Sequence, residues 1–403
     1  MERRAGRQVA PAVQPAAASG SGRRAVRMPG FDGLRGLAAL SVLVYHVGQF
    51  VPDHDRVTAS IVGRLDQGVS VFFVLSGFLL TRPFITANLR GEPVPRGGPY
   101  ARRRFLRIYP AYWCALLVSV YVLDQGTLRG FRLKAEHVAL VQTYFHWPHG
   151  TALTVAWTLV IEVTFYAVLP LYAALVRLVA RRIRPVYAEL GGALLLLVAG
   201  TAVQLAYSAD SSSIPVWARI FPLYAPMFAW GMLLAIAAVW WQDRDEMPRP
   251  LHWIARHGGL CWLAGIGCLL GLAAFLGTTP PVALHRSEVL ALLVVGGVLG
   301  LAFVLPLALS PTRTGVVPTV LGWRPVAYLG TISYAFYLWH LALMDKLDPH
   351  FTYRGLSGFL ELMLLTIAVT VAVASASWYL LERPIIRWSR RPRVMPGRRR
   401  EPV

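Results

Sequence analysis

Charged residues are scarce in this chain. Only 15% of its 403 residues are charged and 56% are hydrophobic, whereas soluble domains average about 25% charged residues. With so little charge and a mean hydropathy of +0.50, the chain cannot hide its apolar surface in the core of a water-soluble domain. This excludes a soluble globular protein and favours an integral membrane protein.

Acidic residues are scarcer than basic ones. The chain has 20 Asp and Glu residues against 40 Lys and Arg residues, which gives a net charge of +20. A nucleic-acid-binding domain would carry such charge as a stripe over one face. Here the basic residues form short clusters between apolar runs, a pattern typical of membrane topology and, secondarily, of phosphate-bearing ligands. We therefore expect no nucleic-acid partner.

Cysteine is also rare. The three cysteines, Cys114, Cys261 and Cys268, all lie inside apolar runs, and the chain has neither a CxxC motif nor a Cys/His pair. Small core residues explain this usage, so we expect no disulfide framework and no metal site.

Long apolar runs, by contrast, fill most of the chain. A helix of about 20 residues crosses a bilayer, and ten runs approach this length. The segment Glu136–Phe145 is too short to cross. The predicted fold class is all-α, a polytopic transmembrane helix bundle of about ten helices, plus one short re-entrant or interfacial helix. The ten predicted spans are Gly33–Val51, Gly68–Ala87, Ile108–Leu123, Trp157–Leu175, Leu190–Tyr207, Arg219–Trp241, Gly259–Gly277, Val289–Leu309, Val326–Met344 and Ser357–Leu380.

The basic residues also predict an orientation. Thirty of the 40 lie on one alternating set of segments and nine on the other, with Arg35 inside the first span. Because cytoplasmic loops carry the excess of Lys and Arg, both termini are expected in the cytoplasm of a multi-pass plasma-membrane protein. Residues 1–29 are polar and predict a disordered cytoplasmic tail, residues 30–388 the membrane domain, and residues 389–403 a basic cytoplasmic tail. The abundance of Ala, Arg and Gly is typical of a bacterium of high GC content.

Two polar residues inside the first span, Arg35 and His46, are candidates for function, because polar groups within a membrane are costly. They are eleven residues apart. On an α-helix they lie about 20° from a shared face and about 16 Å apart along the axis. Arg35 is then near the cytoplasmic mouth and His46 deeper in the membrane. A basic anchor and a histidine packed within the bundle would give the same spacing.

The segment that contains both residues, FDGLRGLAALSVLVYH, resembles the opening signature of the acyltransferase-3 family of membrane O-acyltransferases, in which ten residues separate an Arg from a His. Five further motifs follow in the family's order, so the resemblance runs from Phe31 to about Trp388. The chain departs from the common pattern at Ser70 and Val163, where acidic residues are frequent, and both departures bear on substrate polarity. The five motifs are GVSVFFVLSGFLLTRPF, RRRFLRIYPAYW, WTLVIEVTFYAVLP, LGTISYAFYLWHLAL and LERPIIRW.

The resemblance implies that residues 30–388 form a transmembrane acyltransferase domain. It would move an acyl group, acetyl or another short chain, from acyl-CoA to a hydroxyl of a sugar, glycan or glycosylated metabolite. Acyl-CoA would be a co-substrate, with no cofactor bound permanently. His46 would be the general base, a role that suits a neutral imidazole with an ordinary pKa of about 6.5. Transfer is expected to be direct, with a route through an acyl-histidine as the alternative.

Arginines are expected to bind the phosphates of acyl-CoA at the cytoplasmic mouth, since their forked donors suit phosphate. The motif points to Arg35. A basic cluster that borders the third span is a second candidate, and anchoring by positive charge would explain it equally well. The cluster consists of Arg102, Arg103, Arg104 and Arg107.

Three further residues complete the candidate site. Glu162 lies inside the fourth span and is expected to be catalytic: it could orient His46, pair with an arginine or bind an acceptor hydroxyl, and a structural ion pair is the alternative. Tyr166 and His340 are expected to contact substrate. Ser76 is assigned to close packing between helices, because no base is fixed near it by sequence.

A proton-coupled transporter of a small solute is the rival interpretation, because buried Arg, His and Glu residues would serve it too. A non-catalytic scaffold is a third. No inverted repeat is evident, and six motifs in order favour the enzyme.

Overall fold

The computed structural model describes residues 29–51, 55–126, 128–145, 152–209, 219–242, 244, 248–278, 285–309, 315–348 and 355–389. The regular structure of these ranges is helical, and no strand occurs within them. The all-α fold class is therefore confirmed. The two predicted tails, residues 1–29 and 389–403, lie outside the described residues except for Pro29 and Ser389.

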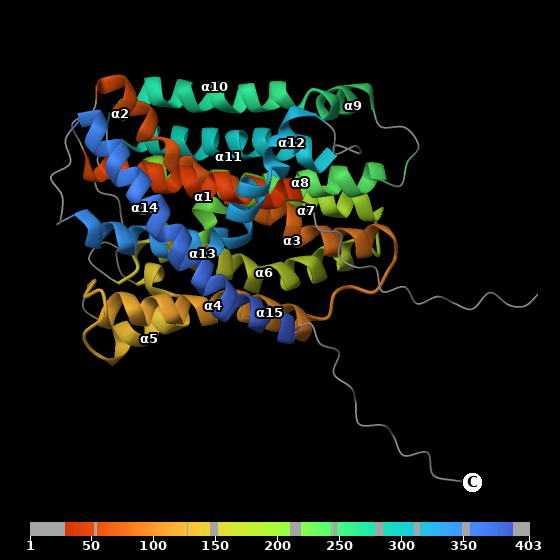
Figure 1. Ribbon diagram of the computed structural model, residues 1–403. Coiled ribbons are helices and arrows are strands. Elements are labelled where there is room, and N and C mark those ends of the chain that lie inside the picture. Colours follow the sequence, from red (N-terminus) through yellow and green to blue (C-terminus); the bar gives the residue numbers. More distant parts are fainter. Residues whose placement is uncertain are drawn as a thin grey trace, which may run out of the picture.

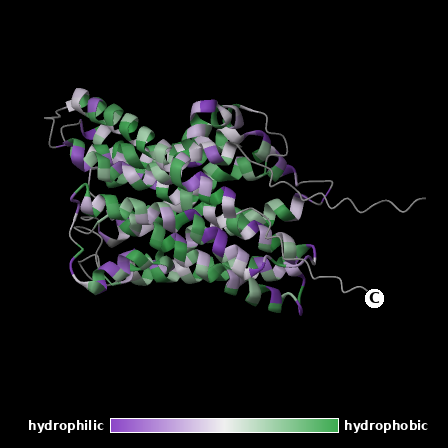
Figure 2. Ribbon diagram, turned by 60° about the horizontal axis from the view of Figure 1, so that its bottom comes forward, coloured by the Kyte–Doolittle hydropathy of each residue, from purple (hydrophilic) through white to green (hydrophobic). Residues whose placement is uncertain are grey.

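Ten helices of 19 residues or more lie within the described ranges, one at each predicted span (Figure 1). Hydrophobic residues predominate along them, and hydrophilic residues gather mainly at helix ends and at a few interior positions (Figure 2). The ten are α1 (Pro29–Phe50), α3 (Gly68–Leu89), α4 (Gly97–Tyr121), α6 (Trp157–Val179), α7 (Pro185–Ala209), α8 (Phe221–Gln242), α10 (Gly258–Leu276), α11 (Arg286–Leu309), α13 (Arg324–Leu347) and α14 (Gly355–Ser377).

Shorter helices connect or flank the long ones. Most lie at the ends of the bundle, and one single-turn π-helix, Trp378–Glu382, links α14 to the last helix. The short helices are α2 (Arg56–Val62), α5 (Phe131–Ala139), α9 (Arg249–Arg256), α12 (Val316–Gly322) and α15 (Arg383–Ser389), with 3₁₀ turns at Leu65–Gln67, Gln142–Tyr144 and Thr154–Ala156.

Eight of the ten long helices are both long enough and apolar enough to cross a membrane. Helices α1 and α4 do not meet both conditions. Helix α4 begins at Gly97, eleven residues before the predicted start at Ile108. The basic RRRFLR segment extends the helix because arginine has a high helix propensity, and its charges lower the mean hydropathy of α4. The predicted boundary was wrong because it followed hydropathy alone.

Helices α1 and α13 approach closely at the end of the bundle where α1 begins, called here the basic end. A methyl group added to Gly330 of α13 would collide with the backbone carbonyl of Asp32, and one added to Gly36 would lie 2.7 Å from the backbone nitrogen of Gly330. Small residues permit such backbone contact between membrane helices. The contact brings polar side chains of the two helices together, among them Arg35 of α1 and Ser333 of α13.

Helices α3 and α8 form a second close pair. A side chain on Gly77 would collide with the carbonyl of Phe228, and one on Gly231 with the carbonyl of Val74. The rings of Phe73 and Phe228 stack beside this contact with centroids 5.0 Å apart. This contact between α3 and α8 fixes which α3 residues face the interior of the bundle, and Ser76, next to Gly77, is one of them.

The short predicted segment Glu136–Phe145 forms α5 and the following 3₁₀ turn, and α5 begins earlier, at Phe131. Aromatic residues of α4 hold it from one side: Tyr112 donates to the carbonyl of His137 at 2.7 Å, and Trp113 to that of Val138 at 2.9 Å. Phe131 is 88% exposed. The helix therefore lies along α4 at the edge of the bundle (Figure 1) and does not enter it.

Candidate active site

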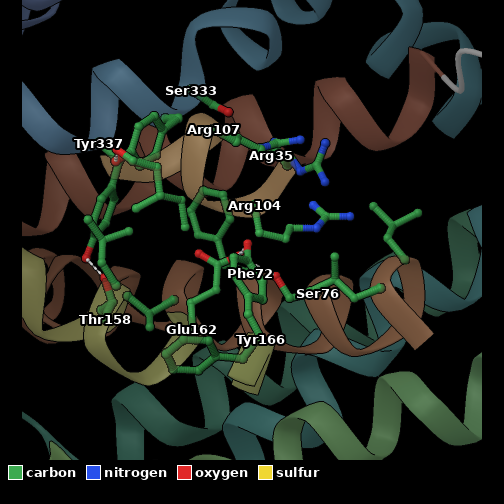
Figure 3. A pocket seen from close by; sticks show the side chains of 17 residues that line it. Arg35, Phe72, Ser76, Arg104, Arg107, Thr158, Glu162, Tyr166, Ser333 and Tyr337 are labelled. Atoms are coloured by element: carbon green, nitrogen blue, oxygen red, sulfur yellow. Dashed lines mark hydrogen bonds between the residues drawn. The ribbon is translucent and has the colours of Figure 1, made fainter. Parts of the chain in front are cut away.

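A cavity of about 80 Å³ lies among helices α1, α3, α4, α6 and α13 (Figure 3). We call it the chamber. Helix α3 lines it from Val69 to Leu80 and α6 from Thr158 to Tyr166, whereas α1 contributes Arg35 alone. Its polar lining is Arg35, Ser76, Arg104, Arg107, Thr158, Glu162, Tyr166, Ser333, Tyr334 and Tyr337, and its apolar lining is Val69, Phe72, Phe73, Leu79, Leu80, Ile108 and Leu159.

The carboxylate of Glu162 holds two hydroxyl groups in the chamber. Ser76 donates to its Oε1 at 3.0 Å, and Tyr166, one turn along α6, donates to the same oxygen at 2.5 Å. The guanidinium of Arg104 lies 5.5 Å from the centroid of the Tyr166 ring. Glu162 is thus satisfied by hydroxyls, and the side chain that orients His46 is a different one.

The five predicted arginines divide into two groups. Arg35, Arg104 and Arg107 line the chamber and extend toward one side of it (Figure 3). Arg35 also forms an ion pair with Asp32 at 3.4 Å. The other two lie outside the chamber lining. Arg102 packs over the ring of Trp388 at 4.7 Å, and Arg103 is exposed.

His46 and His340 contact each other on the interior side of α1. Nε2 of His340 lies 3.1 Å from Nδ1 of His46. Nδ1 of His46 lies 2.9 Å from the carbonyl of Val42, and Nδ1 of His340 lies 2.6 Å from that of Tyr337. His340 is fully buried.

These contacts assign the tautomers of both rings. A carbonyl oxygen only accepts a hydrogen bond, so both Nδ1 atoms carry the proton. The N–H of His46 is then shared between the carbonyl of Val42 and the unprotonated Nε2 of His340. Nε2 of His46 keeps its lone pair and is free to accept a proton.

Arg35 and His46 both face α13, as the helical spacing predicts. Arg35 reaches the chamber beside Ser333, whereas His46 reaches His340 and is absent from the chamber lining. Tyr337 contacts both regions: it lines the chamber, and its ring lies 5.5 Å from that of His340. The Tyr337 hydroxyl is held by Thr158 at 3.0 Å. Tyr337 therefore separates the histidines from the chamber in this conformation.

One chamber residue and one arginine outside the chamber were missed from the sequence. Ser76 was assigned to packing, and its contact with Glu162 crosses 86 residues of chain. Arg219 lies at the opposite end of the bundle, with its guanidinium 4.9 Å from the Trp157 ring. Its position at the edge of the sixth predicted span was a usable signal, because an arginine there is costly.

Metal chemistry was not expected from the sequence. Among the described residues, no group of three or more His, Cys, Asp or Glu side chains could hold a metal ion. The polar side chains that line the chamber carry guanidinium groups, hydroxyls and one carboxylate.

Comparison with known proteins decides the family. A family model described as an acyltransferase domain matches residues 28–382. The chain belongs to this acyltransferase family. The matched residues include the first five motifs quoted above in full and the sixth, LERPIIRW, as far as Glu382. Together with the apolar helices, the match shows a membrane protein of this family. No solved structure matches the chain.

Three relatives illustrate the breadth of the family. The candidate peptidoglycan O-acetyltransferase YrhL of Bacillus subtilis (strain 168) is 26% identical over 89% of this chain and 55% of its own length. Acyltransferase MdmB of Streptomyces mycarofaciens is 34% identical over 38% of this chain and 41% of its own. Exopolysaccharide production protein ExoZ of Rhizobium meliloti (strain 1021) is 28% identical over 88% and 98%. The chain thus spans about half the length of YrhL but nearly all of ExoZ.

Proposed function

We propose that the protein transfers an acetyl or other short acyl group from acyl-CoA to a hydroxyl of a carbohydrate, with His46 as the general base. The observation that carries this proposal is the histidine pair. Because Val42 and His340 engage Nδ1 of His46, its Nε2 is left to accept a proton. General-base catalysis of this kind contributes roughly 10²–10⁴-fold to the rate.

The names of several relatives support a carbohydrate acceptor. They include the Listeria monocytogenes peptidoglycan O-acetyltransferase OatA, 24% identical over 89% of this chain, and the exopolysaccharide protein described above. A sugar, glycan or glycosylated metabolite offers the hydroxyl that this chemistry needs. Tyr166 is proposed to contact substrate, whereas His340, which the sequence also assigned to substrate contact, is proposed to position His46.

The arginines of the chamber support an anionic donor. Arg35, Arg104 and Arg107 present forked donors at one side of it, and such groups bind phosphate through paired hydrogen bonds. The chamber volume of about 80 Å³ equals the space of roughly six water molecules. This size suits an acetyl or other short acyl group better than a long chain.

The proposed reaction is a direct transfer. The acceptor oxygen attacks the thioester carbonyl carbon while its proton passes to Nε2 of His46. The C–S bond then breaks, an ester forms, and the CoA thiolate takes the proton from the imidazolium. His340 keeps the ring in position throughout. Glu162, with Ser76 and Tyr166, is proposed to guide the acyl group through the chamber on its way to His46.

The distribution of Lys and Arg supports placing the basic end in the cytoplasm of a plasma-membrane protein, with both termini on that side. Acyl-CoA would then enter at Arg35 and the acyl group would pass Tyr337 to reach His46.

A transfer assay tests the proposal. Membranes that contain the protein are incubated with acetyl-CoA labelled in the acetyl group and with candidate glycan acceptors. Label should reach an acceptor hydroxyl with wild type and not with His46→Ala. If no acceptor is labelled while the protein carries a solute across vesicles, the enzyme assignment is wrong and the transporter is correct.

A further inference from the structure

A second cavity, of about 700 Å³, opens at the basic end among α1, α4, α13, the π-helical turn and α15. We call it the vestibule. It shares Arg35, Arg107, Ser333 and Tyr334 with the lining of the chamber. The two cavities therefore adjoin, and anything that enters the chamber past Arg35 and Arg107 contacts the vestibule first.

Arginines face the vestibule from two sides. Arg35 and Arg107 come from α1 and α4, while Arg383 and Arg387 lie one turn apart on α15. The acidic residues of the described lining are Asp32, which pairs with Arg35, and Glu382, which is 5% exposed. The vestibule thus carries an excess of positive charge.

The chain turns Arg383 and Arg387 toward this space through the π-helical turn. A π turn adds a residue to the helix and shifts the facing of the residues after it, and such turns are frequent at functional sites. This turn also places Trp378 and Tyr379 in the vestibule wall, with the Arg383 guanidinium 5.3 Å from the Tyr379 ring. The wall therefore combines aromatic faces with forked donors.

Helix α15 is held in place by an arginine first assigned to donor binding. Arg102 of α4 packs over Trp388 at the end of α15, next to the turn that carries Arg387. Figure 1 shows α15 beside the start of α4. Arg102 is thereby suited to position the basic face of α15 rather than to contact the donor itself.

We propose that the vestibule binds the phosphate-bearing nucleotide end of the acyl donor, with Arg383 and Arg387 as a second arginine arm opposite Arg35 and Arg107. This inference rests on the proposed acyl-CoA donor. Phosphates would be held between the two arms, and the purine would pack on the Trp378 and Tyr379 faces. The thioester end would then extend into the chamber. Phosphate groups of anionic lipids share this chemistry, so the test separates the two sources.

The first measurement is the affinity for CoA itself. The full-length protein in phosphatidylcholine nanodiscs is titrated with CoA by calorimetry, with no transfer required. Arg383→Gln and Arg387→Gln should each weaken binding roughly 10-fold, because each removes charge-assisted hydrogen bonds. The double variant Arg249→Gln/Arg256→Gln is the matched control, since it removes two exposed arginines of α9 at the same end of the bundle. It should bind CoA as wild type does.

The second measurement compares two donors. S-acetylpantetheine carries the thioester but no nucleotide. Substitution of Arg383 and Arg387 should raise KM for acetyl-CoA and leave KM for S-acetylpantetheine unchanged. Arg383→Lys should recover only part of the loss, because a point charge replaces a forked donor. Unfolding temperatures of all variants exclude a general loss of structure.

The outcomes are separable. Unchanged CoA affinity in both arginine variants overturns the vestibule site. If that affinity is unchanged and only binding of phosphatidylglycerol from mixed nanodiscs falls, the arginines hold lipid headgroups and the inference is wrong. If wild type binds no CoA and transfers no acetyl group from it, the proposed function fails as well. If CoA binding requires Arg383 and Arg387 but no acetyl group is transferred, the vestibule site is supported and the proposed reaction is wrong.

Discussion

At the basic end of the bundle, four arginines face a cavity of about 700 Å³, whereas on the other side of Tyr337 two histidines contact each other, the fully buried His340 and the half-buried His46. The first region is charged and open, as the binding of an anionic substrate requires. The second offers the lone pair of an imidazole, as proton transfer from a hydroxyl requires. Helix α1 contributes one residue to each region, Arg35 and His46. The comparison teaches that binding and chemistry are divided along this helix, and substitutions can separate them.

His46→Gln should give the largest effect and should act on chemistry alone. We expect acetyl transfer to fall by roughly 10²–10⁴-fold, the range of general-base catalysis, with CoA affinity unchanged. Initial rates with labelled acetyl-CoA and calorimetry measure the two quantities. His252→Gln, at an exposed histidine of α9, is the control and should leave both unchanged. A His46 variant that keeps wild-type rates would contradict the division.

Arg35→Gln tests the other end of the same helix. It removes a guanidinium from both cavities and breaks the ion pair between Arg35 and Asp32. We expect kcat/KM for acetyl-CoA to fall by roughly 10–100-fold, mainly through KM, because charge-assisted hydrogen bonds to phosphate are lost. Steady-state kinetics at varied acetyl-CoA measure this. A fall confined to kcat, with KM unchanged, would argue that Arg35 acts in the chemical step.

His340 is expected to act through His46. His340→Leu removes one of the two acceptors for the Nδ1 proton of His46 and leaves the carbonyl of Val42, so that ring is less well oriented. We expect kcat to fall about 10-fold with KM for acetyl-CoA unchanged, and we expect the pH profile of kcat to shift. His340→Gln keeps an oxygen that can accept the same proton and should restore part of the rate. Equal losses of kcat in His340→Leu and His340→Gln would indicate that His340 serves the packing of the helices and does not orient His46.

Arg103→Gln should have the smallest effect. Arg103 belongs to the basic cluster of the sequence, yet it is exposed and absent from the linings of both cavities. We expect kcat and KM to stay within about twofold of wild type, as is usual for exposed charges. The matched substitution is Arg107→Gln on the same helix, which should raise KM for acetyl-CoA. Equal effects of the two would remove the distinction between cavity and surface arginines.

The positions of the ten long helices could be predicted because a bilayer sets the length of an apolar run, and run length is a local property of sequence. The shared side of Arg35 and His46 could be predicted for a similar reason, since helical periodicity fixes it. The start of α4 could not, because arginine-rich sequence continues a helix that hydropathy does not mark.

The partners within the site also escaped the sequence. His340 and His46 are separated by 294 residues and Ser76 and Glu162 by 86, and no local pattern encodes which helices become neighbours. The direction in which Arg383 and Arg387 point depends on the π-helical turn before them. The periodicity of the sequence does not distinguish such a turn from an α-helix. The separate positions of Arg102 and Arg103 likewise follow from how α4 packs against α15.

The backbone contact of Gly36 and Gly330 has a consequence for motion. The two backbones leave no room for a side chain there, so we expect α1 and α13 to move together. Arg35, His46 and His340 all lie on these two helices, and we therefore expect their spacing to change little during a reaction cycle. An opening that admits an acceptor is then expected from helices α3, α4 or α6, or from rotation of the Tyr337 ring about its own side-chain bonds.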